Sequence, residues 1–153
     1  MTPDRNTNHL YLPFRSKVLG IVEELTAWCA VHWPGHTAAI AEGFRSTARQ
    51  QELYAQGRTT KGDIVTEKNG TTNPSNHQSC LAADIVGVTA KGELTWDCPK
   101  EFWEYLQHLA HLQGLTSGSD WKTFKDAPHV EWPTSDRATY QSAAAWKAGA
   151  GLK

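Results

Sequence analysis

The feature that most constrains the fold of this sequence is an acidic residue inside an apolar run. Residues Leu81 to Val88 read LAADIVGV, and this run has the length and side-chain types of a buried or half-buried strand. The carboxylate of Asp84 would destabilise such a strand by several kcal/mol unless another group paired with it. His77 lies in the preceding turn and is free to fold back over Asp84. A cation held between these two side chains would satisfy the carboxylate.

The composition predicts one globular domain. With 153 residues, 39% of them hydrophobic, the chain is long enough for one modest core, which we place at residues 14–133, followed by a tail at 134–153. The net charge is −1 and the basic residues are dispersed. Because no basic run or stripe suits a phosphate backbone, the sequence does not favour nucleic acid as a partner.

The sequence also carries expectations about cellular location. The N-terminus lacks the apolar stretch of a secretion signal, and no segment approaches the roughly 20 apolar residues of a membrane span. We therefore expect synthesis in the cytoplasm without a signal peptide, and no insertion into a membrane. The chain has an odd number of cysteines at irregular spacings, namely Cys29, Cys80 and Cys98. This pattern favours reduced thiols over a disulfide framework.

Hydrophobic periodicity and turn residues predict an α+β fold. Ser16 is expected to cap the first helix, and Thr47 with Gln50 to form a capping box for the second. The polar segment from Arg58 to Asn76 is expected to be a long loop, and the tail a short alanine-rich helix that frays. The first and third helices should flank a small antiparallel sheet. The expected elements are helices at 17–33, 48–56 and 99–114 and strands at 37–46, 81–88 and 127–132.

Three stretches supply residue types that are typical of a zinc hydrolase. Such enzymes commonly use three protein ligands drawn from histidine and carboxylate, and leave a fourth position for water. His77, Asp84 and His129 can supply this set. Asp126 precedes His129 in the sequence DAPH and is a candidate general base. Arg45, at the end of its strand, is a candidate positive group for a developing oxyanion.

Three segments of the sequence together resemble a family of zinc peptidases. They are GFRSTARQQELYAQGRT, SNHQSCLAAD and GSDWKTFKDAPHVEW. This family contains the D-alanyl-D-alanine dipeptidases and carboxypeptidases of the VanX and VanY type, and the L-alanyl-D-glutamate endopeptidases, among them phage endolysins. Its pattern SxHxxGxAxD corresponds to residues 75–84, and its later (D/E)xxH to residues 126–129. The resemblance covers roughly residues 40–132. The resemblance implies a D-Ala-D-Ala metallopeptidase-like fold in which His77, Asp84 and His129 bind Zn²⁺. It also implies that Asp126 is the general base, and that Arg45 stabilises the developing oxyanion or orients the substrate.

One residue departs from the family pattern. Cys80 stands where the pattern has glycine. If that glycine permits a tight turn or a positive φ, a cysteine alters the local loop geometry. A thiol this close to the predicted ligands is also a candidate ligand and a candidate site of oxidation. A thiol dyad of Cys80 with His77 would leave Asp84 unexplained, so the zinc interpretation is preferred.

Within the family, the chain resembles the L-alanyl-D-glutamate endopeptidases, because GSDWKTF precedes DAPHVEW and the base candidate is an aspartate. We expect a monomeric phage endolysin that acts on bacterial peptidoglycan after the host membrane has been opened. Two alternatives stay open. One is a D,D-carboxypeptidase or dipeptidase that removes terminal D-Ala, and the other is a non-catalytic, zinc-stabilised wall-binding module.

Several residues near these motifs have both a functional and a structural interpretation. Ser75 and Trp121 are predicted to contact the substrate. Trp121, Phe124 and Trp132 would wall a substrate groove or, equally, pack in the core. Glu131 either orients a metal ligand on the same strand or is solvated.

Overall fold

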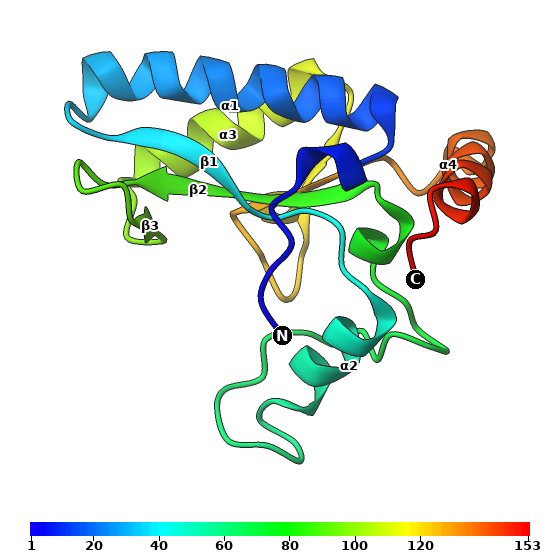
Figure 1. The fold of residues 1–153 in the computed structure, drawn as a ribbon. Coiled ribbons are helices and arrows are strands. Elements are labelled where there is room, and N and C mark those ends of the chain that lie inside the picture. The colour runs from blue at the N-terminus through cyan, green and yellow to red at the C-terminus, as the bar shows by residue number, and fades with distance from the viewer.

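A small antiparallel sheet with helices packed on it forms the body of the protein in the computed structural model, which describes residues 1–153 (Figure 1). The strands are β1 (Thr37–Glu42), β2 (Ala82–Val88), β3 (Leu94–Thr95), β4 (Thr116–Ser117) and β5 (His129–Glu131). They lie in the order β1-β2-β5-β4, and β3 also pairs with β2. The α+β fold predicted from the sequence is confirmed.

The helices vary widely in length. The α-helices are α1 (Leu12–His32), α2 (Thr47–Ala55), α3 (Lys100–Leu112) and α4 (Arg137–Gly149), and the 3₁₀ helices are η1 (Thr7–His9), η2 (Asn76–Ser79) and η3 (Gly118–Asp120). None of them is both long and apolar enough to cross a membrane.

The hydrophobic core lies between the sheet and the pair of helices α1 and α3, which run along one side of it (Figure 1). Ala83 and Ile85 of β2 and Val130 of β5 belong to this core. Because side chains alternate along a strand, Asp84 and His129 point to the opposite face of the sheet. The main helical contributions to the core are Phe14, Val18, Ile21, Leu25, Phe102 and Leu106. The sheet therefore separates an apolar layer from a polar one.

The first long helix begins earlier than the sequence-based expectation. α1 starts at Leu12 rather than Lys17, with Pro13 in its first turn. Proline suits this place because the first N–H groups of a helix have no partner within the helix. Ser16 was expected to be the cap, but it lies inside α1 and its hydroxyl donates to the carbonyl of Leu12 (3.2 Å).

The second helix is capped one residue earlier than expected. The hydroxyl of Ser46 accepts the N–H of Arg49 (3.2 Å), so the predicted capping box of Thr47 and Gln50 is wrong. The preceding strand ends at Glu42 and not at Ser46. The two-residue strands β3 and β4 were not predicted, since they are too short to show a periodicity. The loop between α2 and η2 is confirmed, with no helix or extended strand in it.

The C-terminal tail is a packed helix, not the frayed one expected. Ala143 of α4 is buried in the core, and the hydroxyl of Tyr140 donates to the carbonyl of Trp132 (2.7 Å). The ring of Trp146 lies against that of Tyr11, with centroids 5.8 Å apart. The core therefore extends past the predicted boundary at residue 133.

Cys80 ends η2 in the left-handed conformation (φ 62°), and its side chain is fully buried. This backbone conformation costs a residue other than glycine about 1–2 kcal/mol. We expect Cys80→Gly to relieve that strain and to lose the packing of the thiol, leaving the free energy of unfolding within about 1 kcal/mol of the wild type.

Urea denaturation measures this change. A loss of stability well above about 1 kcal/mol would show instead that the packing of the thiol outweighs the strain at residue 80.

Candidate metal centre

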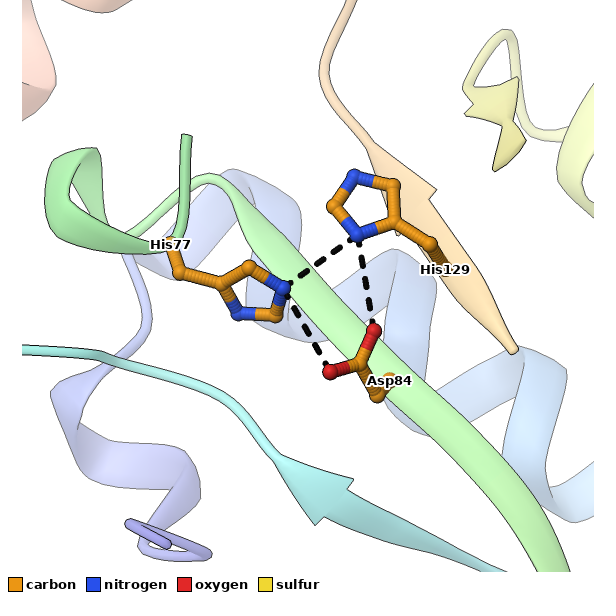
Figure 2. Close-up of side chains that lie close together, drawn as sticks. All are labelled: His77, Asp84 and His129. Atoms are coloured by element: carbon orange, nitrogen blue, oxygen red, sulfur yellow. Dashed lines mark hydrogen bonds and ion pairs between the residues drawn. The ribbon is translucent and has the colours of Figure 1, made fainter. Parts of the chain in front are cut away.

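Three side chains from separate elements meet on the polar face of the sheet (Figure 2). His77 comes from η2, Asp84 from β2 and His129 from β5. Nε2 of His77 lies 3.2 Å from Nδ1 of His129 and 3.5 Å from Oδ2 of Asp84. Nδ1 of His129 lies 3.4 Å from Oδ1 of Asp84. One atom from each of these residues could therefore bind a shared metal ion.

The ring of His77 is held by its other nitrogen. Nδ1 lies 2.7 Å from the carbonyl oxygen of Gly43. Because a carbonyl only accepts, Nδ1 carries the hydrogen and Nε2 is left with a lone pair directed at Asp84 and His129. This bond fixes both the tautomer and the orientation of the His77 imidazole.

The turn that carries His77 is closed by a capping box. The hydroxyl of Ser75 accepts the N–H of His77 (3.4 Å), and the side chain of Gln78 accepts the N–H of Ser75 (3.0 Å). Ser75 is buried. The structure thus gives Ser75 a local part in shaping η2, and the substrate contact predicted for it stays a prediction.

The ring of His129 is also held from behind. Its Nε2 lies 2.7 Å from Oε2 of Glu131, which is buried on the same face of β5. The carboxylate accepts the Nε2 hydrogen, so Nδ1 is the nitrogen that faces Asp84 and His77. Of the two interpretations of Glu131, the structure supports the one in which it orients His129.

The clustered side chains shift one another's pKa values. Burial alone would raise the pKa of Asp84, but the neighbouring His77 and His129 outweigh burial and hold this pKa well below its usual value. Burial would lower the pKa of His129, but Asp84 and Glu131 raise it to about 9. Oδ1 of Asp84 is buried and has no hydrogen-bond partner. Asp84 is therefore a charged carboxylate with one unpartnered oxygen, which is a place where a cation could bind.

A β-bulge brings a second carboxylate beside Asp84. Ile40 pairs with Ile85, but the next paired residues are Glu42 and Asp84, so β1 contains one extra residue. Without the bulge, the small residue Ala41 would stand opposite Asp84. Glu42 showed the same sequence signal as Asp84, a carboxylate in an apolar strand, but it was not predicted as part of the site.

Arg45 lies between these two carboxylates. It is buried, its Nε donates to Glu42 (3.0 Å), and its Nη2 lies 3.5 Å from Oδ2 of Asp84. Its Nη1 donates to the side chain of Gln50 (2.9 Å), a fully buried residue that the sequence did not single out. The structure therefore brings Arg45 to the group, with most of its N–H groups already bound within the protein.

Asp126 and Trp121 border the group from the segment between η3 and β5. The ring centroid of Trp121 lies 5.0 Å from that of His129. Asp126 is an exposed residue, but nearby residues of the protein partly shield its carboxyl group from water. This shielding, together with the negative charge of Asp84, raises the pKa of Asp126.

The other two aromatic residues predicted for a groove differ in their surroundings. Phe124 is exposed, whereas Trp132 packs against the core and donates to Asp136 (2.9 Å).

Comparison with known proteins shows a likeness to one peptidase family. The sequence profile described as D-alanyl-D-alanine carboxypeptidase matches residues 69–132, the span that holds the three clustered side chains and Asp126. The peptidoglycan L-alanyl-D-glutamate endopeptidase CwlK of Bacillus subtilis is 41% identical over 104 residues, and the match covers 63% of this chain and 61% of CwlK. Residues 69–132 of the chain therefore resemble this peptidase family. The chain spans less than two thirds of the relative's length, so the activity of CwlK is carried over only as a proposal below.

Solved structures of related proteins share the fold. The L-Ala D-Glu endopeptidase ChiX of Serratia marcescens has a TM-score of 0.58 at 22% identity, covering 86% of each chain. DacB of Streptococcus pneumoniae has a TM-score of 0.55 at 17% identity, covering 94% of this chain and 78% of DacB. At these identities the likeness supports the architecture and not a substrate.

Gly118 was missed by the sequence interpretation, and it fixes the segment that carries Asp126. The carbonyl of Gly118 accepts the N–H of Asp126 (3.1 Å). A Cβ at residue 118 would overlap the carbonyl oxygen of Asp126 and lie 3.0 Å from Cβ of His129. We expect Gly118→Ala to displace both residues and to lower the free energy of unfolding by roughly 1–3 kcal/mol.

Gly149→Ala is the matched control, because nothing lies within 4 Å of a Cβ at that residue of α4. It should be neutral or slightly stabilising in the same urea denaturation experiment. Equal stability of the two variants would contradict the assigned constraint at Gly118.

Proposed function

We propose that this protein is a zinc-dependent peptidoglycan peptidase that cleaves the L-alanyl-D-glutamate bond of stem peptides. The observation that carries the proposal is the convergence of three side chains that can each offer one ligand atom, with these atoms all within 4.8 Å of one another. The two imidazole nitrogens lie 3.2 Å apart, and each lies 3.4 to 3.5 Å from a different oxygen of Asp84. Tetrahedral zinc with bonds of about 2.0–2.1 Å separates its ligand atoms by roughly 3.3–3.4 Å. The unpartnered Oδ1 of Asp84 provides the charge that a cation would balance.

His77, Asp84 and His129 would hold the ion, and residues behind them keep their ligand atoms directed inward. When bound, zinc supplies a polarised water and a positive charge beside the scissile carbonyl. Gly43 and Glu131 fix the two imidazoles, as their hydrogen bonds of 2.7 Å indicate.

Asp126 is proposed as the general base. Its raised pKa makes it a stronger proton acceptor than an ordinary aspartate, and its exposure on the rim of the group lets it reach a water beside the metal. It would accept a proton from the attacking water and pass it to the nitrogen of the leaving amine. A base in this place argues against a non-catalytic wall-binding module.

Arg45 and Trp121 are proposed to assist. Arg45 balances Asp84 and Glu42, and it can reach substrate or a developing oxyanion only through the Nη1 hydrogen that Gln50 does not use. Trp121, beside His129, would form one wall of the groove for the peptide.

The choice of bond rests on the 41% identity to an L-alanyl-D-glutamate endopeptidase. The family profile is described as a D-alanyl-D-alanine carboxypeptidase, which keeps removal of terminal D-Ala as the second candidate. We further propose that the protein works as a monomer and serves as a phage endolysin, reaching the wall after the membrane is opened.

Digestion of purified peptidoglycan, with mass spectrometry of the products, tests the activity. The proposal predicts stem-peptide fragments that begin at D-Glu. Loss of D-Ala alone would replace it with the carboxypeptidase activity. Absence of any product from the zinc-loaded protein would contradict both.

A metal-removal experiment tests the cofactor. We expect one zinc per chain by elemental analysis, loss of hydrolysis after chelation, and recovery when zinc is restored, because the three ligand atoms can surround one ion. A metal-free preparation with full activity would refute the zinc proposal.

Two variants separate the proposed base from a proposed ligand. His129→Ala should lose zinc as well as activity, and should melt at a lower temperature in the presence of zinc. Asp126→Ala should keep its zinc and its fold, while turnover falls by roughly 10²–10⁴-fold, as expected when a positioned base is removed. Zinc content, melting temperature and peptidoglycan hydrolysis are measured side by side.

If Asp126→Ala loses zinc as readily as His129→Ala, Asp126 is a ligand and not the base. If its turnover is near normal, the base lies elsewhere and Glu131 is the next residue to test.

A further inference from the structure

Lys147 of the C-terminal helix contacts the turn that carries His77. Its Nζ donates to the carbonyl of Gln78 (2.7 Å), the residue that follows His77. The helix α4 packs against η2, the short turn that precedes β2 (Figure 1). Lys147 is 69 residues from Gln78 in sequence and lies outside the span 69–132 that matches the family profile.

Lys147 also contacts the second segment that holds His77. Its Nζ lies 5.3 Å from the ring centroid of Phe44, within the range of a cation–π contact. Phe44 stands between Gly43, whose carbonyl accepts the Nδ1 hydrogen of His77, and Arg45, whose N–H donates to the carbonyl of His77 (3.2 Å). One ammonium group therefore touches both the turn that bears His77 and the segment that fixes its ring.

These contacts are of a kind that can hold the turn η2 in a fixed position. η2 is only four residues long, and the last carbonyls of such a helix lack partners within it. A lysine ammonium near this end satisfies a carbonyl and interacts favourably with the partial negative charge there. Lys147 is half-buried, so water screens the interaction less than at a fully exposed site.

We propose that Lys147 is a positioning residue for the metal centre, which braces η2 against residues 43–45 and thereby keeps Nε2 of His77 directed at the ion. The inference rests on the proposed metal site. It assigns to α4, which the sequence predicted to be a frayed tail, a part in metal binding.

The test compares Lys147→Met, which keeps the aliphatic stem but removes the donor and the charge, with Lys147→Arg, which restores both. The control is Arg137→Met on the same helix, since the Arg137 side chain is exposed and makes no hydrogen bond or ion pair in the structure. Zinc affinity is measured by competition with a chelating dye, and the melting temperature is measured on the zinc-free proteins.

We expect Lys147→Met to weaken zinc binding about tenfold, at the lower end of the effect of residues that orient metal ligands. Lys147→Arg should bind zinc within about twofold of the wild type, and Arg137→Met should match the wild type. Zinc affinity of Lys147→Met within twofold of the wild type would overturn the proposal, even if its melting temperature falls. Should Lys147→Met fail to fold, Lys147→Gln, which keeps a donor without the charge, takes its place with the same criteria.

His77→Ala is measured in parallel to separate this inference from the proposed function. It should abolish tight zinc binding. If it binds zinc like the wild type, the metal site itself is misassigned and the part given to Lys147 falls with it. If His77→Ala loses zinc and Lys147→Met does not, only the brace is wrong.

Discussion

The arrangement of the site depends on one half-buried carboxylate in the middle of a central strand. Asp84 belongs to β2, whose neighbouring residues Ala83 and Ile85 are in the core. Two imidazoles and a guanidinium gather around its oxygens at 3.4 to 3.5 Å, yet Oδ1 still lacks a hydrogen-bond partner. An unpaired buried charge is among the most costly features of a folded protein, so this surrounding has to supply positive charge.

Each side chain of the proposed zinc site is held by a residue from a different part of the chain. Gly43 holds His77, Glu131 holds His129, and Arg45 lies against Asp84. The three proposed ligands stand on a strand or on a tightly capped turn, and the core beneath the sheet resists their displacement. The residue proposed to move protons, Asp126, is instead on an exposed connection whose path is fixed by Gly118.

The carboxylate in the apolar run at residues 81–88 was sufficient to predict that Asp84 needs a partner, and the motifs at 75–84 and 126–129 were sufficient to predict the likeness to a peptidase family. Local signals were less reliable at helix starts, where Pro13 and Ser46 compete with neighbouring candidates for the cap. The remaining features arise from contacts between distant segments. The bulge that turns Glu42 toward Asp84, the close approach over Gly118 and the reach of Lys147 to η2 all depend on the folded chain and leave no periodic pattern in the sequence.

The central claim is that the carboxylate of Asp84 and the imidazoles of His77 and His129 form one zinc site. X-ray absorption spectroscopy of the zinc-loaded protein tests it most directly, because the method reports the elements bound to the metal. The account predicts two imidazole nitrogens and oxygen neighbours at about 2.0–2.2 Å, with no sulfur. A sulfur neighbour at about 2.3 Å, which would require the buried thiol of Cys80 to bind the metal, or a spectrum with only one imidazole, would contradict it.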